Sequence, residues 1–316
     1  MRYVVKRFLM LIPVLFVVTF ASFYLISLLP GDPALAVLGP GATAEAIAQE
    51  HHELGLDKPI TTRYVKYLDH VVHGNLGESS TTHQDVTTQL KTRLPVTLEL
   101  LVLSQIIAFA VSVPLGILAA RRPGSLLDKL STSGAFGLLA IPSFMLGVLL
   151  VFLFAVKAQL LPAGGFTRLT QDPLTNLKDM ILPSVTLGLG SVAVYLRVLR
   201  SDMITTLQQD YITMARAKGM SQRWILMRHA FRPSTFSLMT VAGLNIGALI
   251  GGALVVEQVF SLPGIGTMIV TAIYQRDYLT VQGGVLIAAT GYVLVNFLVD
   301  LLYGVADPRV RVDRAR

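Results

Sequence analysis

A few ionisable side chains interrupt the apolar stretches of this sequence, and they are its first candidates for chemistry. Glu99, Glu257 and Asp300 each lie close to the end of a long apolar run. A carboxylate in apolar surroundings can line the path of a polar solute or relay protons, whereas one near the end of such a run can simply reach water. Glu257 is the candidate for a solute path or gate, together with Pro263 and Gly264 in the turn-forming stretch that follows it.

The motifs of soluble enzyme chemistry are absent from the sequence. It contains no cysteine, no G-x-x-x-x-G-K-[ST] phosphate loop and no H-E-x-x-H zinc motif. His51, His52 and Glu53 resemble a metal cluster, but adjacent residues point to different faces of a helix, so we interpret them as solvated side chains. His229 is interpreted as a structural residue. We therefore predict no catalytic residue, no metal site and no cofactor bound by this chain.

The elements that must position these residues are long hydrophobic helices. Hydrophobic residues make up 53% of the 316 residues and charged residues 14%, and the mean hydropathy is +0.62. A soluble domain carries about 25% charged residues, and about 20 apolar residues cross a bilayer as a helix. Because backbone groups in lipid must be paired internally, we predict an all-α integral membrane protein with six transmembrane helices. The six segments are 8–29, 96–120, 131–156, 180–196, 234–256 and 281–299.

The distribution of basic residues predicts the orientation of these helices. The net charge is +7, and most of the 26 Lys and Arg residues fall in the terminal segments or in connections on the same side of the membrane. Such an excess is typical of the cytoplasmic side, so both termini are predicted to be cytoplasmic. The charge therefore indicates orientation and not a nucleic-acid site. The first apolar run exceeds a signal-peptide core of about 7–15 residues, so we interpret it as an uncleaved anchor.

These segments predict how the chain is organised. Residues 1–30 form the first transmembrane helix, and 31–95 form an extracytoplasmic loop or small domain. Residues 96–308 form a five-helix core that includes a cytoplasmic loop at 201–233, and 309–316 form a basic cytoplasmic tail.

Three glycines mark a packing surface within the fifth predicted helix. Gly243, Gly247 and Gly251 form two successive G-x-x-x-G motifs. Glycine at every fourth position lets the backbone of another helix approach closely, although glycine is also frequent in membrane helices in general. The pattern predicts close packing and leaves the neighbouring helix open.

The loop between the fourth and fifth predicted helices is far longer than a simple connection needs to be. Apolar residues recur there every three or four positions and predict one helical face: Met203, Leu207, Tyr211 and Met214. Gly219 stands where a glycine cap would end this helix, and Ser221 can cap the start of a second one. Two interpretations fit an amphipathic, basic segment of this kind: a docking site for a partner, or a helix lying on anionic lipid.

The same loop carries a family resemblance. Ala215 and Gly219, spaced as Ala-x-x-x-Gly, resemble the "EAA" loop of permease subunits of bacterial ABC importers. The family's Glu-Ala pair is replaced by Thr213-Met214, and Pro233 falls one residue later than the family's proline. Further motifs, in order along nearly the whole chain, resemble the dipeptide/oligopeptide permease B branch: Leu29-Pro30-Gly31-Asp32-Pro33-Ala34, Leu54-Gly55-Leu56-Asp57-Lys58-Pro59, Gly74-Asn75-Leu76-Gly77, Ile181-Leu182-Pro183-Ser184, Asp210-Tyr211-Ile212, Val259-Phe260-Ser261-Leu262-Pro263-Gly264, Arg276-Asp277-Tyr278, Val281-Gln282-Gly283-Gly284 and Asp307-Pro308-Arg309.

This resemblance implies the type I permease fold of ABC importers and a division of labour between subunits. Such a subunit forms half of a path for di- or oligopeptides in the bacterial inner membrane. It works beside a second homologous permease, two ATP-binding subunits and an extracytoplasmic solute-binding protein. ATP and Mg would be used by the partner ATPases and not by this chain. The residues that the resemblance assigns to the ATPase-coupling loop are Tyr211, Thr213, Met214, Ala215, Arg216, Lys218 and Gly219.

Other functions stay open at this point. Relatives of this branch also carry nickel complexes, glutathione or sugars, and no residue pattern assigns the solute. A stand-alone secondary transporter would need an ionisable group near the middle of the membrane, and an intramembrane enzyme would need a nucleophile with its base. Neither arrangement is visible in the sequence.

Overall fold

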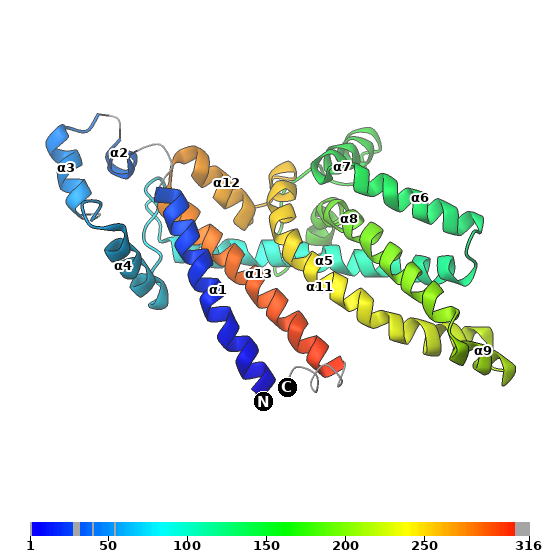
Figure 1. The fold of residues 1–316 in the computed structure, drawn as a ribbon. Coiled ribbons are helices and arrows are strands. Elements are labelled where there is room, and N and C mark those ends of the chain that lie inside the picture. The colour runs from blue at the N-terminus through cyan, green and yellow to red at the C-terminus, as the bar shows by residue number, and fades with distance from the viewer. Residues whose placement is uncertain (1, 28–31, 40, 54, 307–316) are drawn as a thin grey trace.

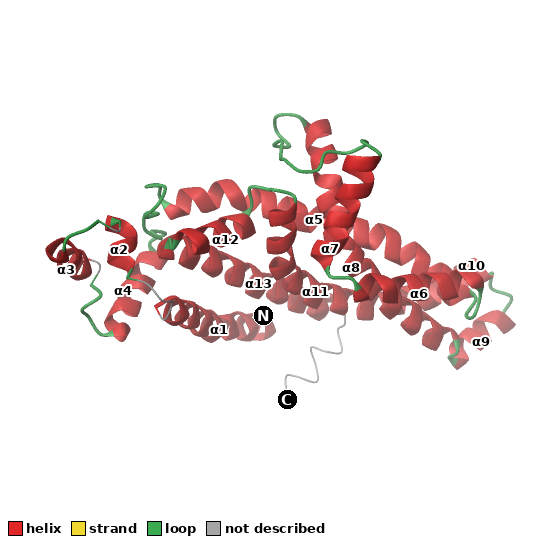
Figure 2. Ribbon diagram, turned by 90° about the horizontal axis from the view of Figure 1, so that it is seen from above, coloured by secondary structure: helices red, strands yellow, loops and turns green. Residues whose placement is uncertain are grey.

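The computed structural model describes residues 2–27, 32–39, 41–53 and 55–306, which fold into a set of packed helices (Figure 1, Figure 2). Within them, one isolated antiparallel bridge joins Glu78 and Asp85. The predicted tail 309–316 lies outside the described residues. The elements in chain order are α1 (Arg2–Ser27), α2 (Pro33–Leu38), α3 (Ala44–Glu53), α4 (Ile60–Val72), α5 (Val86–Arg121), α6 (Leu126–Ala140), α7 (Ser143–Leu150), η1 (Val151–Lys157), α8 (Pro173–Leu207), α9 (Asp210–Ala217), α10 (Gln222–Trp224), η2 (Ile225–Phe231), α11 (Arg232–Val259), α12 (Ile265–Gln275) and α13 (Tyr278–Ala306).

Several of these helices are long and apolar enough to cross a membrane. The bent pair Leu126–Ala140 and Ser143–Lys157 can be counted as one further crossing, and the apolar stretch Leu9–Tyr24 within α1 is shorter. The all-α prediction is thus confirmed, with four or five long apolar helices in the described part of the chain. The four that qualify singly are Val86–Arg121, Pro173–Leu207, Gln222–Val259 and Tyr278–Val299.

The segment 131–156, predicted as one membrane helix, is instead two helices that meet at 105°. α6 ends at Ala140, and α7 begins directly after Pro142. Proline cannot donate a backbone hydrogen bond and pushes the preceding residue out of the helical region. Ile141 accordingly has extended backbone angles, with φ −95° and ψ 124°. Hydrophobicity predicted the apolar segment correctly, but the proline divides it.

α8 is longer at both ends than the predicted span 180–196. Asp172 caps its start, because its carboxylate accepts hydrogen bonds from the backbone N–H of Leu174 (3.0 Å) and of Thr175 (3.2 Å). The apolar window therefore captured only the middle of a 35-residue helix.

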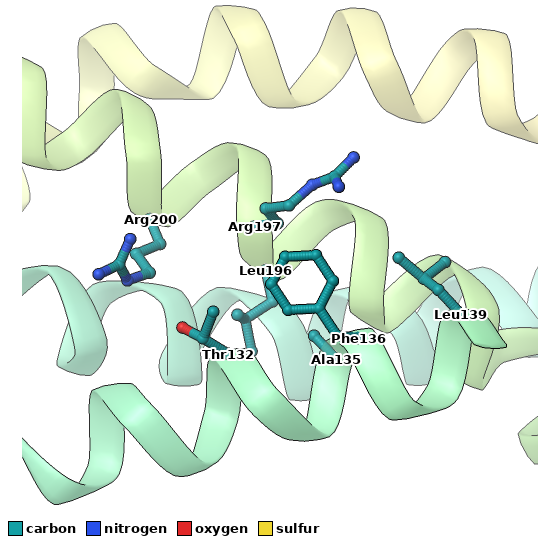
Figure 3. A pocket seen from close by; sticks show the side chains of 7 residues that line it. All are labelled: Thr132, Ala135, Phe136, Leu139, Leu196, Arg197 and Arg200. Carbon is teal, nitrogen blue, oxygen red and sulfur yellow. The ribbon is translucent and has the colours of Figure 1, made fainter.

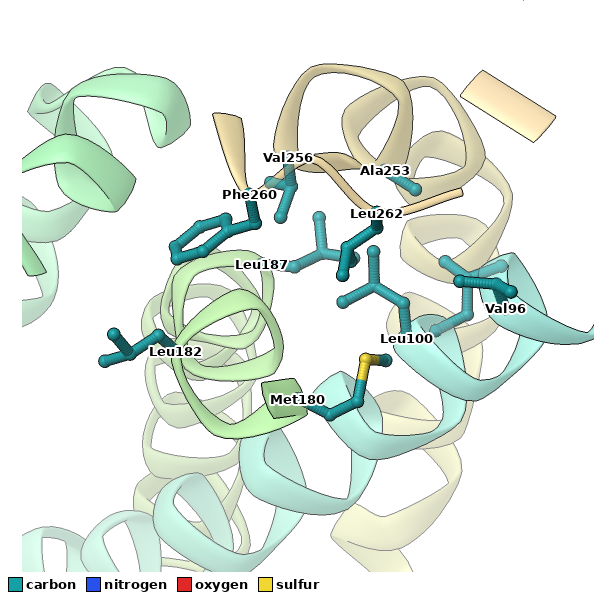
Figure 4. Packing of buried hydrophobic residues seen from close by; sticks show 10 residues of the cluster. Val96, Leu100, Met180, Leu182, Leu187, Ala253, Val256, Phe260 and Leu262 are labelled. Carbon is teal, nitrogen blue, oxygen red and sulfur yellow. The ribbon is translucent and has the colours of Figure 1, made fainter. Parts of the chain in front are cut away.

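Two hydrophobic clusters hold α5, α8 and α11 together. In the first, shown in Figure 4, Leu100, Leu187 and Val256 reach from these three helices into one space. In the second, Leu199 of α8 packs with Leu238 of α11, closer to α9. Association in lipid depends on such close van der Waals packing, because lipid tails are as apolar as leucine. α5, α8 and α11 each contribute side chains to both clusters and together form the packed core of the bundle.

Helices α2, α3 and α4 gather at the opposite end of the molecule from α9 (Figure 1). α4 is attached to α1 by Tyr64, whose ring meets Phe16 (5.5 Å) and Phe20 (5.1 Å) edge to face. The Tyr64 hydroxyl donates to the Phe16 carbonyl at 3.1 Å and lies 2.8 Å from the Thr19 hydroxyl. The 31–95 segment is thereby fixed to the first helix.

A second attachment joins the loop before α5 to the turn between α12 and α13. Asp277 is 2% exposed and accepts hydrogen bonds from the hydroxyls of Ser79, Thr81 (3.3 Å) and Thr280 (2.7 Å). A buried carboxylate requires such donors, because leaving it without hydrogen-bond partners costs about 1–3 kcal/mol or more. Asp277 therefore holds the 74–85 loop against the bundle.

Candidate functional site

The predicted docking loop forms a compact unit at one end of the bundle. α9 packs on η2 through Ile212 and Ala215, which are buried against Ile225. Tyr211 reaches the same element, since its hydroxyl donates to the carbonyl of His229 at 3.3 Å. The loop is therefore a fixed surface of the bundle.

The turn after α9 has the geometry that the sequence predicts. Gly219 has φ +75°, its N–H donates to the carbonyl of Arg216 (2.9 Å), and Met220 N–H donates to the carbonyl of Ala215 (3.3 Å). These two bonds form a Schellman cap, in which glycine is preferred because a Cβ is strained at positive φ. Ser221 then caps α10 by accepting a hydrogen bond from Trp224 N–H at 3.4 Å.

An apolar surface remains uncovered around this turn. Tyr211 is 45% exposed, Met214 60% and Trp224 48%. Basic side chains border it, since Arg216 and Lys218 are exposed, as is Thr213. Further apolar side chains of the same loop, Met220 and Met227, are also exposed. Aromatic, Met and Arg side chains are enriched in protein interfaces, so the composition suits docking of another protein. We call this surface the α9 surface.

The prediction that Met203, Leu207, Tyr211 and Met214 form one helical face is wrong. Met203 and Leu207 lie in α8, whereas Tyr211 and Met214 lie in α9, and the chain turns between the two helices. Gln209 is extended, with ψ 150°, so the three-to-four spacing does not continue across it. The side chains that α9 buries are Ile212 and Ala215, and the predicted pair points outward.

Two of the three packing glycines lie against α13. A Cβ placed on Gly243 would come within 2.3 Å of both methyl groups of Val299, and one on Gly247 within 2.8 Å of the Tyr292 ring. A Cβ on Gly251 would meet nothing within 4 Å. Each four-residue step advances about 40° beyond a full helical turn, so the stripe rotates away from α13 before it reaches Gly251.

Glu257 is fully buried and joins three helices. Its carboxylate accepts a hydrogen bond from the Thr97 hydroxyl of α5 (2.6 Å) and one from the backbone N–H of Thr267 in α12 (3.1 Å). Thr97 in turn accepts from Ile265 N–H at 2.9 Å. The carboxylate thus satisfies the free donors at the start of α12 and suits their positive dipole.

The turn that leads from α11 to α12 is closely fitted around Glu257. A Cβ on Gly264 would lie 2.3 Å from the Glu257 carboxylate, so only glycine fits there. Pro263, the other predicted gate residue, is exposed. The three predicted gate residues are therefore neighbours, with a buried carboxylate beneath an exposed turn.

Known proteins resemble this chain over almost its whole length. Residues 112–312 match the family described as binding-protein-dependent transport system inner membrane component. Residues 1–101 match the N-terminal region of the membrane component of such systems. This chain belongs to that family. It is a multi-pass permease of the inner membrane, and the α9 surface, the glycine contacts and Glu257 all fall within the larger match.

Named relatives of the permease are similar along their full lengths. A putative peptide transport system permease protein of Brucella abortus (strain 2308) is 40% identical, with 98% of this chain and 99% of the relative covered. A di/tripeptide transport system permease protein of Pseudomonas aeruginosa (strain UCBPP-PA14) is 38% identical, with 99% and 100% covered. A dipeptide transport system permease protein of Escherichia coli (strain K12) is 37% identical, with 98% and 99% covered.

The permease also contains a buried polar network that the sequence did not predict. Tyr195 of α8 donates to the side-chain oxygen of Gln105 in α5 at 2.6 Å. Asn245 of α11 donates to the Tyr195 hydroxyl (3.1 Å) and to Ser191 (2.7 Å). Hydrogen bonds between membrane helices join them specifically. The signal in the sequence is the presence of uncharged polar residues, such as Gln105 and Asn245, within the apolar runs.

The adjacent histidines His51 and His52 have separate partners in the permease. His51 Nε2 lies 2.7 Å from the Asp32 carboxylate, and His52 Nδ1 lies 3.2 Å from that of Asp57. The His51 hydrogen bond is the main cause that lowers the pKa of Asp32. Among the residues that the structure describes, no three His, Asp or Glu side chains come together as a metal site.

Proposed function

We propose that this permease is the membrane subunit of an ATP-driven importer for di- or oligopeptides. It forms half of the translocation path and is coupled to an ATPase through residues 202–233. The chain itself performs no hydrolysis, and ATP and Mg²⁺ are used by partner subunits. Peptide as the solute is supported by the names of the relatives from Brucella, Pseudomonas and Escherichia.

The observation that carries this proposal is the α9 surface. A large apolar patch outside the membrane spans marks a site of interaction, because exposing it to water is unfavourable. Met214 is 60% exposed and Trp224 48%, yet the helices beneath them are capped and packed. A rigid, apolar and basic surface of this kind suits a groove on a soluble partner, and the ATPase is the soluble partner on the cytoplasmic side.

We propose six spans with both termini cytoplasmic. Four long helices of the described residues provide four of them. α1 provides another through its apolar stretch Leu9–Tyr24, and the bent pair Leu126–Ala140 and Ser143–Lys157 provides the last. This arrangement places α9 and the basic connections inside and α2–α4 outside, where a solute-binding protein delivers the peptide.

The partners follow from this arrangement. A second homologous permease completes the path, two ATP-binding subunits drive it, and an extracytoplasmic binding protein supplies the solute. The gate is proposed at the α11–α12 turn, where Pro263 is exposed and Glu257 fixes the start of α12. A transport cycle needs two packings of the bundle, and ligands shift the balance between them only through differential affinity.

The test is a substitution in the Schellman cap. Gly219→Val places a β-branched residue at φ +75° without any steric neighbour within 4 Å, so only the turn is strained. We expect the permease to insert and assemble with its membrane partner, while ATPase co-purification and solute-stimulated ATP hydrolysis both fall in the reconstituted complex.

Gly74→Val is the matched control. Gly74 has φ +74° and also has no atom within 4 Å of a built Cβ, but it lies in the 31–95 segment. This variant carries the same backbone strain at the other end of the molecule and should keep ATPase binding. Wild-type coupling in Gly219→Val would remove the docking role from the α9 surface and leave a helix that lies on lipid.

A further inference from the structure

A small pocket lies between α6 and α8, on a part of the permease that has no role so far. It is a shallow groove that is open to the outside of the helices, and the space between its walls, open solvent included, is about 260 Å³ (Figure 3). Apolar side chains form most of its wall, and two arginines from α8 stand on its rim. The lining residues are Thr132, Ala135, Phe136, Leu139, Leu196, Arg197 and Arg200.

The two arginines differ in what they bind. Arg200 forms a two-pronged ion pair with Asp128 of α6, through its Nε and, at 2.8 Å, through Nη2. Asp128 is buried and also accepts from Gly124 N–H at 2.8 Å, so this pair is a fixed structural feature. Arg197 is exposed and has no ion pair or hydrogen bond among the described residues. In Figure 3 it extends away from Arg200, so a charged group without a partner stands at the pocket.

Polarity changes along the pocket in one direction. α6 and α8 lie side by side and run in opposite directions, so Thr132 and Arg200 stand at one end while Leu139 stands at the other (Figure 3). Phe136 lies between these ends, with its ring over α8. The charged end is the one closer to α9, and the apolar end points toward the middle of the bundle. Because Asp128 neutralises Arg200, the unpaired charge of the groove is that of Arg197, which stands between the two ends. A ligand with an anionic head at Arg197 and a hydrocarbon tail directed toward Leu139 matches this arrangement.

We propose that this pocket binds an anionic phospholipid of the cytoplasmic leaflet. The phosphate lies at Arg197, and one acyl chain lies along Phe136 and Leu139. Basic pockets between membrane helices on the cytoplasmic side attract anionic headgroups, and guanidinium groups bind phosphate with favourable geometry. The assignment to the cytoplasmic leaflet rests on the membrane topology given under the proposed function. The charge and shape of the pocket are independent of that topology.

The experiment measures lipid retention by the complete complex. The permease and its partners are reconstituted in nanodiscs of phosphatidylethanolamine and phosphatidylglycerol, extracted into mild detergent and analysed by native mass spectrometry. Wild type should retain phosphatidylglycerol above its bulk proportion. Arg197→Gln should retain about fivefold less, the effect of one basic side chain at an anionic lipid, and Arg197→Lys should retain most of it.

Lys129→Gln is the matched control, because Lys129 is an exposed cation at the start of α6 that does not line the pocket. Equal retention by wild type and Arg197→Gln would overturn the proposal. An equal loss in Lys129→Gln would also overturn it, since it would show general attraction to the surface. Unchanged lipid with lost peptide uptake in Arg197→Gln would instead place the arginine on the solute path. Because retention is measured without transport, failure of the importer assignment would leave this readout intact.

Discussion

The contact between α11 and α13 gives a prediction whose size follows from the structure. In Gly243→Ala, the new methyl group would lie 2.3 Å from both Cγ atoms of Val299 and 2.8 Å from its Cβ. Carbon atoms pack best at about 3.5–4.0 Å, so the helices must separate by more than 1 Å or Val299 must leave its rotamer. Overpacking of this kind costs about 1–3 kcal/mol. The gain in helix propensity from glycine to alanine is at most about 1 kcal/mol.

The expected net effect of Gly243→Ala is therefore a loss of up to about 2 kcal/mol. Gly251→Ala is the control, because its methyl group meets nothing within 4 Å and retains only the gain in propensity. The two variants should thus shift thermal stability in opposite directions. The assay is the fraction of complex that stays monodisperse by size-exclusion chromatography after heating in detergent.

A double-mutant cycle distinguishes this contact from a general effect. Val299→Ala removes both Cγ atoms but leaves the Cβ at 2.8 Å from the new methyl group, so it should restore part of the loss. Contacting residues typically show a coupling of about 0.5–3 kcal/mol. If Gly243→Ala and Gly251→Ala melt alike, or if Val299→Ala gives no relief, the close approach of α11 to α13 is refuted.

Three other predictions address other parts of the permease. Glu257→Ala should lower the free energy of unfolding by about 1–3 kcal/mol, because the donors at the start of α12 lose their acceptor. Glu257→Gln keeps an acceptor for Thr97 and should lose less stability. Equal melting temperatures of the two variants would contradict this account. The chain has no cysteine of its own, so a single introduced cysteine shows on which side of the membrane its position lies. Val72→Cys, at an 81% exposed position, should react with an impermeant thiol reagent added outside, and Arg122→Cys should not. The reverse pattern would invert the proposed orientation. Asp277→Ala should free the 74–85 loop, seen as faster hydrogen exchange there than in wild type, and unchanged exchange would show that this carboxylate does not hold the loop.

Short-range features of this fold were predictable, because a few adjacent residues determine them. The positive φ at Gly219 and the Ser221 cap depend on residue types within one turn, and both have the predicted geometry. The apolar helices were also predictable, since bilayer thickness sets their length. Sequence could not show that the chain turns at Gln209, which has no glycine or proline signal. Hence Tyr211 and Met214 were predicted on the same helical face as Met203 and Leu207, whereas α9 buries Ile212 and Ala215 instead.

Contacts between distant residues could not be predicted in the same way. Thr97 and Glu257 are far apart in sequence, and only the packing of α5 on α11 brings them together. The sequence indicated that Glu257 was unusual, but its position near the end of α11 fitted either a solvated carboxylate or a solute path. The structure shows a third arrangement, in which it caps α12. The glycine motifs likewise predicted close packing, whereas the identity of α13 as the neighbour depended on the whole fold.

The length of α8 has a mechanical consequence. Its 35 residues span about 52 Å at 1.5 Å per residue, and its side chains belong to both hydrophobic clusters. A tilt of about 5° around its midpoint would move each end by about 2 Å in opposite directions. One end leads directly into α9, and the other begins at Asp172, across the bundle. A small displacement of the α9 surface would therefore produce a displacement of similar size at the Asp172 end of α8, without unfolding of any helix.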